Sequence, residues 1–393
     1  MALVTADVVI IGGGCMGASV AYYLSRLGLT NVVLLEREDQ LGTGSTARNA
    51  GGVRHQFSQP ANVQLSIESI RLFEQFEDTV GVPIDFHQDG YLFLLSEPAH
   101  LEAFQQAAAM QRQLGVQVDW LTAGEAAELA PGLGTDSLEA ATFCARDGIC
   151  DPNGVTMGFA ASARRAGVVI KRGCEVTGIR VDGAGVDGAG VGGGVSGVDT
   201  SQGFIATRIV VNAAGPWAAS IGTMAGVPLP ITPLRRHIFI AGPPAIGAWP
   251  TSHIMVIDFA TSFYFHREGA NLLFGMGDPA ERSGFDISVN WNLLADVAPV
   301  AARRLPALAD AEIVKAWAGL YEMTPDAMPI IGRTGPKGLY TIAGFSGHGF
   351  QHSPAAGRIL ADVITGRDPE CDLSPFSLER FGRPSGVVEG GVV

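Results

Sequence analysis

Lysine is scarce in this chain, and that scarcity narrows the chemistry available to it. Of the 26 basic residues only Lys171, Lys315 and Lys337 are lysines, and the rest are arginines. Few amines therefore remain for Schiff-base chemistry. Acidic residues outnumber basic ones, and the net charge of −13 argues against nucleic-acid binding, which depends on clustered cations that release counterions from phosphates.

Cysteine is also sparse, and long apolar runs are missing. The five cysteines form no CxxC pair, so reduced and mostly buried thiols are expected. Residues 8–35 are apolar, but a glycine triplet and polar residues interrupt them before a run of about 20 apolar residues is reached. The first motif begins at residue 7 and leaves no room for a secretion signal. We therefore expect a cytoplasmic protein without a membrane span.

A nucleotide-binding pattern stands at the start of the chain. An apolar run typical of a buried parallel strand leads into Gly12-x-Gly14-x-x-Gly17. In this pattern the first glycine allows a tight turn, the second lets backbone approach a pyrophosphate, and the third lets the next helix pack on the strand. A second apolar strand over 32–35 ends at Glu36, where a carboxylate can accept both ribose hydroxyls. The whole unit predicts dinucleotide binding.

Three further segments place small residues beside expected strands and helices. The loop 42–52 is rich in glycine and hydroxyl side chains and can wrap an extended ligand closely. Asn212–Trp217 forms a second glycine turn after a strand, where backbone can lie near a ligand. Residues 344–351 turn from a strand into a helix over 353–365, and the N-terminus of a helix carries partial positive charge.

The chain of 393 residues is long enough for two domains. A pattern of strands, glycine turns and helices recurs in residues 1–84, 146–225 and 316–385. We assign them to a discontinuous Rossmann-like α/β domain. Residues 85–145 and 226–315 lack phosphate-binding features, and we assign them to an inserted α+β substrate domain with an antiparallel or mixed sheet.

Two glycine-rich stretches are expected to lie outside the folded core. Residues 182–203 repeat an imperfect Asp-Gly-Ala-Gly-Val pattern and predict a flexible, exposed connection. Residues 386–393 are likewise rich in glycine and valine, and we expect a disordered tail there.

Five motifs, listed at the end of this paragraph in chain order, resemble those of the FAD-dependent D-amino-acid oxidase family. Within it the chain looks most like the branch that holds glycine oxidase, sarcosine oxidase and the β subunits of sarcosine oxidase and proline dehydrogenase. The similarity spans nearly the whole chain and implies a Rossmann-like FAD-binding domain with an inserted substrate domain. The motifs are the Gly12–Gly17 turn with Glu36, Gly44–Gly52, Asn212–Trp217, Thr324–Asp326 and Gly344–Gln351.

The resemblance also implies which residues contact FAD. The glycine turn would hold the pyrophosphate, Glu36 the adenosine ribose and Arg37 the edge of the adenine site. The loop after Glu36 would run beneath the flavin, and Val176 would offer backbone to adenine. The full set assigned to the cofactor is Gly12, Gly14, Met16, Gly17, Glu36, Arg37, Gly44, Ser45, Thr46, Asn49, Gly51, Gly52, Val176, Ala214, Gly215, Trp217, Gly344, Gly347, His348, Gly349, Phe350 and Gln351.

The same resemblance points to residues at the reacting end of the flavin. Arg54 occupies the place that binds the substrate carboxylate in monomeric sarcosine oxidase, a task suited to a guanidinium fork. The alternative for Arg54 is a salt bridge within the cofactor loop. Tyr264, His266 and Tyr321 are expected either to contact the substrate or to pack. His348, at the pyrimidine end of the ring, completes the set assigned to the reaction.

Two departures from the family pattern shape the expected reaction. Monomeric sarcosine oxidase attaches its flavin through a cysteine, but the matching stretch 318–326 contains none, so noncovalent FAD is expected. Relatives also place lysines near the flavin, whereas residues 172–314 contain none. The electron acceptor is therefore open between oxygen, as in an oxidase, and an acceptor protein or quinone, as in a dehydrogenase.

The expected reaction is oxidation of a C–N bond to an imine that hydrolyses, with the flavin supplying the redox chemistry. A secondary amine such as sarcosine, another N-substituted glycine or a cyclic imino acid is the first expectation. A primary amino acid such as glycine or a D-amino acid is the second. A β-type subunit whose activity needs other chains is a further alternative, so both a homo-oligomer and a hetero-oligomeric complex stay open. An NAD-linked dehydrogenase is disfavoured because it needs neither the 44–52 loop nor the Gly-His-Gly segment.

Overall fold

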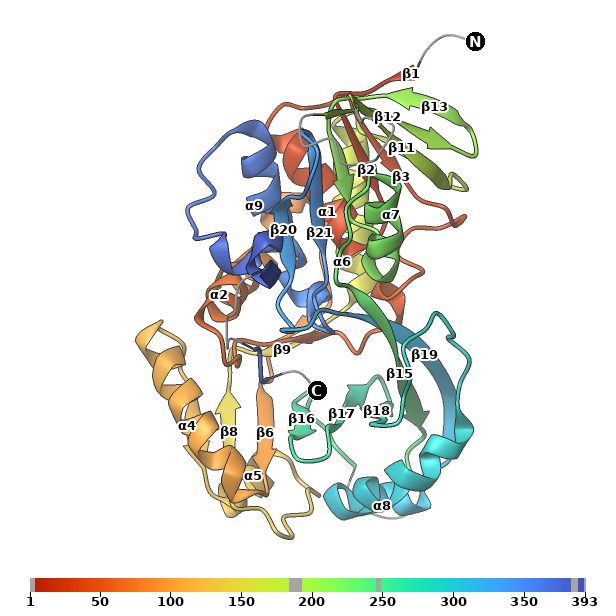
Figure 1. Cartoon of the computed structure of the whole chain (residues 1–393). Coiled ribbons are helices and arrows are strands. Elements are labelled where there is room, and N and C mark those ends of the chain that lie inside the picture. The colour runs from red at the N-terminus through yellow and green to blue at the C-terminus, as the bar shows by residue number, and fades with distance from the viewer. Residues whose placement is uncertain (1–3, 184–192, 245–248, 383–387, 392–393) are drawn as a thin grey trace.

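Two large β-sheets organise the protein, and each draws its strands from separated segments of the sequence (Figure 1). The computed structural model describes residues 4–183, 193–244, 249–382 and 388–391. Within these residues the first large sheet has six strands in the order β10-β3-β2-β14-β21-β20, and the second has eight in the order β19-β15-β18-β17-β16-β6-β8-β7.

The six-stranded sheet is parallel except for its last strand, as expected for a doubly wound fold. Its central strands are rich in apolar residues and are buried along their whole length, because helices cover the sheet. The strands are β2 (Val8–Ile11), β3 (Val32–Leu35), β10 (Val169–Lys171), β14 (Val210–Asn212), β20 (Ile330–Arg333) and β21 (Leu339–Ala343).

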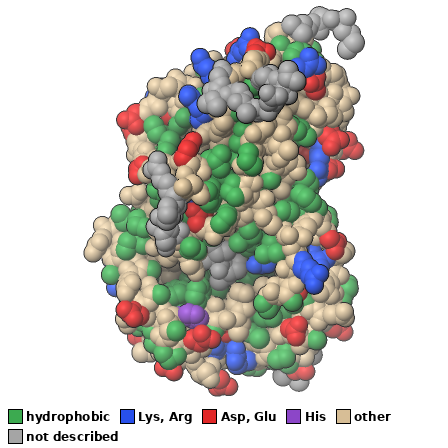
Figure 2. All heavy atoms as spheres, viewed as in Figure 1, with side chains coloured by type: hydrophobic (Ala, Val, Ile, Leu, Met, Phe, Trp, Pro, Cys, Tyr) green, Lys and Arg blue, Asp and Glu red, His purple; other side chains and the backbone are tan. Residues whose placement is uncertain are grey.

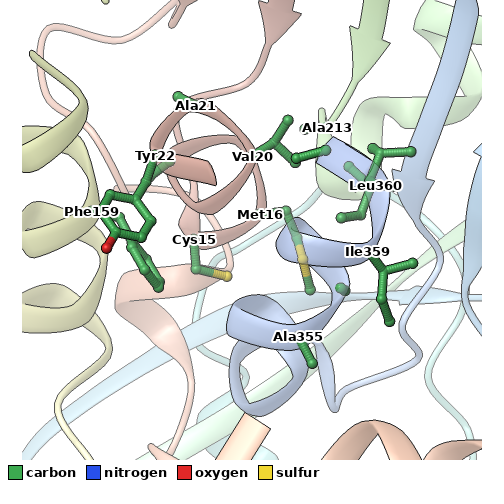
Figure 3. Packing of buried hydrophobic residues seen from close by; sticks show 14 of the residues in the cluster. Cys15, Met16, Val20, Ala21, Tyr22, Phe159, Ala213, Ala355, Ile359 and Leu360 are labelled. Atoms are coloured by element: carbon green, nitrogen blue, oxygen red, sulfur yellow. The ribbon is translucent and has the colours of Figure 1, made fainter. Parts of the chain in front are cut away.

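Helices from both ends of the chain pack beside this sheet. Helix α1 (Cys15–Arg26) contacts α6 (Pro152–Arg165) and α9 (Gly349–Thr365), and α9 also contacts α2 (Pro60–Glu74). Figure 3 shows Met16 and Val20 of α1 beside Ile359 and Leu360 of α9 in this buried cluster. The approach is close because a Cβ at Gly357 would lie 2.1 Å from the Ser19 hydroxyl. Helix α1 is therefore packed closely against α9 at Ser19.

The eight-stranded sheet forms the other half of the molecule, with helices α4 (Pro98–Gln113), α5 (Ala123–Leu129) and α8 (Leu294–Arg304). A parallel pairing of β16 with β6 joins the two inserted segments. The strand of this sheet that comes last in the sequence, β19, continues to Met323. The domain boundary expected at 316 therefore falls inside this strand. The strands are β6 (Tyr91–Leu95), β7 (Asp119–Leu121), β8 (Ala140–Cys144), β15 (Thr232–Ala241), β16 (Met255–Asp258), β17 (Phe263–Glu268), β18 (Asn271–Met276) and β19 (Ile313–Met323).

Two smaller sheets and a few short helices complete the described fold. One sheet joins β1, β13, β12 and β11, and the other joins β4, β9 and β5. The remaining elements are β1 (Val4–Thr5), β4 (Gly52–Val53), β5 (Phe86–His87), β9 (Gly148–Cys150), β11 (Val176–Asp182), β12 (Gly194–Thr200), β13 (Gly203–Ala206), α3 (Phe76–Val80), α7 (Ala218–Met224), and the 3₁₀ turns η1 (Thr46–Arg48), η2 (Gly215–Trp217), η3 (Trp291–Leu293), η4 (Pro306–Asp310), η5 (Ser374–Phe376) and η6 (Leu378–Gly382).

The expectation of a flexible connection over 182–203 is corrected for part of that range. Strand β12 pairs with both β11 and β13, and its Val195 and Val198 are fully buried. A Cβ at Gly197 would lie 2.2 Å from the Phe204 ring, so this glycine serves close packing rather than flexibility. Residues 184–192 lie outside the described residues.

The expectation of a disordered tail over 386–393 is also corrected for residues 388–391. Glu389 is only 2% exposed, and its carboxylate accepts hydrogen bonds from the backbone N–H groups of Ser58 and Gln59 and from the Asn62 side chain, at 2.9, 3.1 and 2.9 Å. These donors lie at the start of α2, where N–H groups lack helical partners and favour a carboxylate. The tail is held by its single acidic residue.

The visible surface carries mixed charge. Figure 2 shows acidic and basic side chains scattered over this face rather than a basic patch, in keeping with the excess of acidic residues in the sequence. Among the described helices, none combines the length and the apolar character that crossing a bilayer requires.

Candidate functional site

A cavity of about 770 Å³ is lined by elements of both large sheets. Glu36 and Trp217 lie in its wall near the six-stranded sheet, while Arg54, Tyr91 and Tyr264 lie in its wall near the eight-stranded sheet. The volume is within the range of about 300–1,000 Å³ that small-molecule sites occupy. The cavity is thus large enough for an extended ligand.

The glycine turn between β2 and α1 forms the floor of the cavity. Gly12 has a φ of +108°, and a Cβ there would lie 2.4 Å from the Ala213 carbonyl oxygen. A Cβ at Gly17 would lie 1.9 Å from the Gly12 oxygen, so this glycine allows the helix to pack on the strand. Gly14 is the N-cap of α1 and provides no side-chain cap. The helix therefore presents its N-terminus to the cavity, an arrangement that suits a phosphate.

Glu36 lies at the end of β3 next to this turn. Its two carboxylate oxygens accept hydrogen bonds from the backbone N–H groups of Gly13 at 2.8 Å and Glu38 at 2.9 Å. Beside it, the Arg37 guanidinium stacks on the Trp217 ring at 3.9 Å, and both residues line the cavity. The acidic residue and a flat aromatic surface therefore share one end of the cavity.

The loop 42–52 folds against the end of β19. The Ser45 hydroxyl donates to the Leu320 carbonyl oxygen at 2.6 Å, and the Arg48 guanidinium donates to the Ala318 carbonyl oxygen at 3.0 Å. The Asn49 amide bonds within the loop, to the Thr46 carbonyl oxygen. A Cβ at Gly52 would lie 2.0 Å from the Tyr91 hydroxyl. The loop therefore ties the glycine turn to the second sheet.

The turn before α9 forms the opposite wall. Gly347 has a φ of +97°, and a Cβ there would lie 2.3 Å from the Tyr321 ring. His348 is the N-cap of α9 and makes no side-chain cap, so the N-terminus of this helix also opens on the cavity. Burial lowers the pKa of His348 to about 4, and its Nε2 lies 3.0 Å from the Ala327 carbonyl oxygen. His348 is therefore a neutral donor near pH 7.

Arg54 follows β4 and is 5% exposed. Its guanidinium donates to the carbonyl oxygens of Gln56 and Gly391 and stacks 3.9 Å from the Phe57 ring. Its backbone N–H donates to Gln351 at 3.1 Å. Burial lowers the pKa of Arg54 from its usual value, although the group stays charged at neutral pH. Arg54 thus brings a desolvated cation into the wall of the cavity.

Asp147 fixes the backbone beside Arg54. It is completely buried and accepts from the His55 N–H at 2.8 Å and the Gln56 amide at 3.3 Å, while its carboxylate lies 2.6 Å from the His55 ring. Donor atoms of His55, Cys144 and Asp147 lie within 4.8 Å of one another. Because Asp147 already accepts these bonds, the cluster is explained as a support for the segment that carries Arg54.

Two tyrosines and a second arginine surround the part of the cavity that Arg54 lines, which we call the chamber. Tyr264 and Tyr321 line it, and burial raises the pKa of each phenol, so both are neutral near pH 7. The Arg236 guanidinium lies 5.1 Å from the centre of the Tyr321 ring. Arg236 donates from one terminal nitrogen to the Arg235 carbonyl oxygen, while its Nε is buried and has no partner among the described residues.

Of the two alternatives expected for His266, substrate contact or packing, the structure favours packing, because His266 does not line the cavity. It is 1% exposed, and its ring nitrogens lie 2.8 Å from the Arg267 oxygen and 3.0 Å from the Ala50 oxygen. Burial lowers its pKa to about 4. His266 therefore supports the loop behind the cavity.

Most of the other residues singled out in the sequence line the cavity. Gly17, Gly51 and Gly344 do not line it: Gly17 lies inside α1, where the helix packs on the Gly12 turn, and a Cβ at Gly51 or Gly344 would meet the Cys150 oxygen or the Thr324 side chain. The residues that do are Gly12, Gly14, Met16, Glu36, Arg37, Gly44, Ser45, Thr46, Asn49, Gly52, Arg54, Val176, Ala214, Gly215, Trp217, Tyr264, Tyr321, Gly347, His348, Gly349, Phe350 and Gln351.

Several lining residues were not part of the sequence-based assignment, and among them are the polar side chains of Arg48, Tyr91, Arg236 and Glu322. Arg48 stands inside the motif 44–52, so its position was a usable signal. The other three lie on strands of the second sheet, where a sequence does not reveal which face of a strand meets a cavity formed with another sheet.

Comparison with known proteins agrees with this geometry. A family model described as "FAD dependent oxidoreductase" matches residues 7–363. Sarcosine oxidase subunit beta of Rhizobium meliloti (strain 1021) is 30% identical over 98% of this chain and 90% of its own length. Mouse dimethylglycine dehydrogenase is 29% identical over 96% of this chain, which spans only 44% of that longer protein.

A solved structure shows the same fold. L-proline dehydrogenase from P. horikoshii superposes with a TM-score of 0.88 at 32% identity, covering 98% of this chain and 100% of that one. The matched family region includes the glycine turn, Glu36, Arg54 and the turn before α9. The chain therefore belongs to the family of FAD-dependent oxidoreductases that the sequence motifs resemble.

Proposed function

We propose that the protein binds FAD noncovalently and oxidises the C–N bond of a small amino acid or N-substituted glycine. One observation carries this proposal: a continuous cavity joins the Gly12–Gly17 turn and Glu36 to a chamber that contains Arg54, Tyr264 and Tyr321. A dinucleotide-type site and a site for a small anionic substrate thus share one space. Relatives named for sarcosine, dimethylglycine and L-proline support a substrate of this class.

The residues present fit FAD. Gly14, the N-cap of α1, adds no side chain, so the start of this helix can approach a pyrophosphate, with the Cys15 N–H already donating to the Thr46 hydroxyl at 3.2 Å. Glu36 stands where a ribose would be bound. The stretch 318–326 beside the loop 42–52 contains no cysteine. Burial raises the pKa of Cys15, a cysteine in the cavity wall, to about 11, which leaves an unreactive thiol. These features support noncovalent binding.

When bound, the flavin supplies the redox chemistry by accepting the hydrogen next to the substrate nitrogen together with its electron pair. The chain orients the substrate. The Arg54 guanidinium would hold both oxygens of a carboxylate, and a fixed carboxylate places the neighbouring C–H bond. Tyr264 and Tyr321 line the same cavity as neutral phenols, so they place no negative charge beside a bound carboxylate. The substrate reacts with its amine neutral, and no general base on the chain is assigned.

The uncapped N-terminus of α9 contributes an electrostatic effect. Its free N–H groups open on the cavity and carry partial positive charge. A helix end placed in this way would stabilise negative charge on a flavin bound beside it.

A second carboxylate anchor is favoured by one observation. Arg236 lines the chamber, and its Nε is buried without a partner among the described residues. An unsatisfied buried donor is costly, so a bound carboxylate would relieve that cost. Arg54 is our first anchor because it follows the cofactor loop directly, and Arg236 is the alternative.

The electron acceptor and the assembly are part of the proposal. Either oxygen or an acceptor protein or quinone takes the electrons, and we favour the dehydrogenase because residues 172–314 contain no lysine. A role as a β-type subunit is supported by the relative named "Sarcosine oxidase subunit beta". Four cysteines are buried as free thiols, which suits a reducing compartment such as the cytoplasm.

Steady-state reduction of an artificial dye by the purified protein tests this function. Sarcosine, proline, glycine and a D-amino acid are supplied in turn, and the imine-derived carbonyl product is measured. We expect turnover with a secondary amine to exceed turnover with a primary one. Absence of turnover with every amine, in a preparation that contains FAD and no other chain, would contradict a self-sufficient enzyme. Recovery of activity on adding copurifying chains would favour the subunit alternative.

A further inference from the structure

Glu322 is a cavity-lining carboxyl that the proposed function leaves without a role. It lies near the end of β19, where its Oε1 accepts from the Phe345 N–H at 3.3 Å and its backbone oxygen accepts from the Ser346 N–H at 3.1 Å. Its second carboxyl oxygen, Oε2, is buried and has no hydrogen-bond partner among the described residues. A buried polar atom without a partner calls for an explanation.

Within the described part of the chain, no cationic side chain shifts the pKa of Glu322. A Cβ placed on Gly215 would lie 3.8 Å from Oε2, and Pro233 is the register partner of Glu322 on β15. Cys15, the first residue of α1, is the titratable side chain that senses the Glu322 charge, and it is a neutral thiol because burial raises its pKa. The turn 344–346 contributes backbone N–H groups only.

A carboxylate in this position is unfavourable. Burial raises the pKa of Glu322 to about 7, although N–H groups of Gly344 and Phe345 act in the opposite direction. A second negative charge nearby raises such a pKa further. A protonated carboxyl offers an O–H donor that an ionised one lacks. Cys15, whose thiol senses the Glu322 charge, is the first residue of α1, and the start of this helix lines the same cavity and suits a pyrophosphate.

We propose that Glu322 binds the cofactor as a neutral carboxylic acid, with its O–H donating a hydrogen bond to an oxygen of the ribityl–pyrophosphate chain of FAD. This inference rests on the proposed FAD site. When the apoprotein binds FAD above the pKa of Glu322, the carboxylate takes one proton from the solvent, and no other bond forms or breaks. FAD binding is therefore linked to proton uptake.

Calorimetric titration of the apoprotein with FAD measures this proton directly. Titrations at about pH 8 in two buffers with different ionisation enthalpies give the number of protons taken up. We expect nearly one proton for the parent protein and none for Glu322→Gln, whose amide donates at every pH. We also expect the FAD dissociation constant of the parent protein to rise up to about tenfold per pH unit above the pKa of Glu322, whereas that of Glu322→Gln stays constant.

Glu36→Gln provides a matched control at the other end of the cavity. It should weaken FAD binding at every pH and still take up the proton. The parent protein binding FAD without proton uptake, or Glu322→Gln retaining the uptake, would overturn the role of Glu322 while leaving the FAD site intact. Failure of the parent apoprotein to bind FAD would overturn the cofactor assignment and this inference together. Glu322→Thr, which removes the carboxyl but keeps a donor, serves if the glutamine variant does not fold.

Discussion

At the scale of single residues, the functional assignment depends on where buried charges find partners. The Arg54 guanidinium is held by carbonyl oxygens rather than by a carboxylate, which does not support the alternative of a salt bridge within the cofactor loop. Carbonyl groups orient a guanidinium without neutralising its charge, so the cation remains available to an anionic substrate. Glu36, in contrast, accepts two backbone hydrogen bonds and is oriented toward the cofactor end of the cavity.

Substitution of Arg54 tests the substrate anchor. We expect Arg54→Lys to keep FAD but to lose substrate affinity and flavin-reduction rate, because an ammonium supplies charge without the planar fork. Arg54→Ala should lose more. Anaerobic stopped-flow reduction at several substrate concentrations separates the two effects, and Arg236→Lys is the matched comparison. If both Arg54 variants reduce at the parent rate with parent affinity while Arg236→Lys is impaired, Arg236 is the anchor.

Substitution of Glu36 tests the adenosine end. Glu36→Ala removes a charge-assisted hydrogen-bond partner, at a cost of about 1.5–3 kcal/mol, or roughly 10–150-fold in FAD affinity. Turnover of the fully loaded variant should change far less, because Glu36 lies far along the cavity from Arg54. Fluorescence titration of apoprotein with FAD measures the affinity. An unchanged dissociation constant would remove Glu36 from the site.

At the scale of elements, the C-terminal segment 388–391 connects the substrate chamber to α2. Glu389 binds the start of that helix, and two residues later the Gly391 carbonyl oxygen accepts from Arg54. The backbone N–H of Glu389 donates to the Asp326 oxygen at 2.9 Å. The segment therefore holds three parts of the fold in one place, and Arg54 takes its orientation partly from it.

We expect Glu389→Ala to loosen this connection. Loss of a buried carboxylate with several donors should lower the local opening free energy by about 1.5–3 kcal/mol. Hydrogen exchange at the amides of Ser58 and Gln59 measures that change, and Val388→Ala, at a neighbouring exposed residue, is the control. Unchanged protection at both amides would show that Glu389 does not hold the helix start.

The same contact predicts a pH dependence. Burial opposes ionisation of Glu389, but hydrogen bonds from Ser58 and Asn62 outweigh it, and the net pKa is lowered. A lowered pKa in the folded state stabilises the contact above the pKa of the unfolded chain, and this stability is lost as the pH falls through the folded value. Protection of the Ser58 amide should therefore decline on acidification in the parent protein. Glu389→Gln should lack that step.

The sequence predicts some elements well and others poorly, for physical reasons. The Gly12–Gly17 turn and Glu36 belong to one contiguous strand-helix-strand unit, so local spacing determines their geometry. Glu322 and Arg236 depend on the register of β15 against β19, a pairing between segments far apart in the chain. The glycines of β12 and of the C-terminal segment suggested flexibility. In the structure, however, Gly197 packs against Phe204, and the Glu389 carboxylate holds the C-terminal segment against the start of α2. Composition alone does not reveal such tertiary contacts.

At the scale of the whole molecule, the cavity between two sheets explains why the chain is built from interleaved segments. The six-stranded sheet supplies the glycine turn and Glu36, and the eight-stranded sheet supplies Tyr264 and Arg236. Neither sheet contains a complete site. A cofactor that spans both would also hold the two halves together, since a ligand that binds only the folded state stabilises it.

Electron disposal is a property of the whole protein, and its test needs no substitution. Once a substrate has reduced the flavin without oxygen, we expect reoxidation by air to be slower than reoxidation by an artificial dye. The reason is that residues 172–314 contain no lysine, the residue type that the family resemblance places near the flavin. Peroxide formation at the rate of turnover would contradict this and identify an oxidase.

The most direct test of the central claim is anaerobic mixing of the purified protein with matched amines, followed by its absorption spectrum. The protein should be yellow, acid precipitation should release its FAD into the supernatant, and sarcosine should bleach the flavin. The corresponding N-methylamine without a carboxylate should bleach it far more slowly, because Arg54 then has nothing to hold. Equal bleaching by both amines, or colour that stays with the acid pellet, would contradict the account.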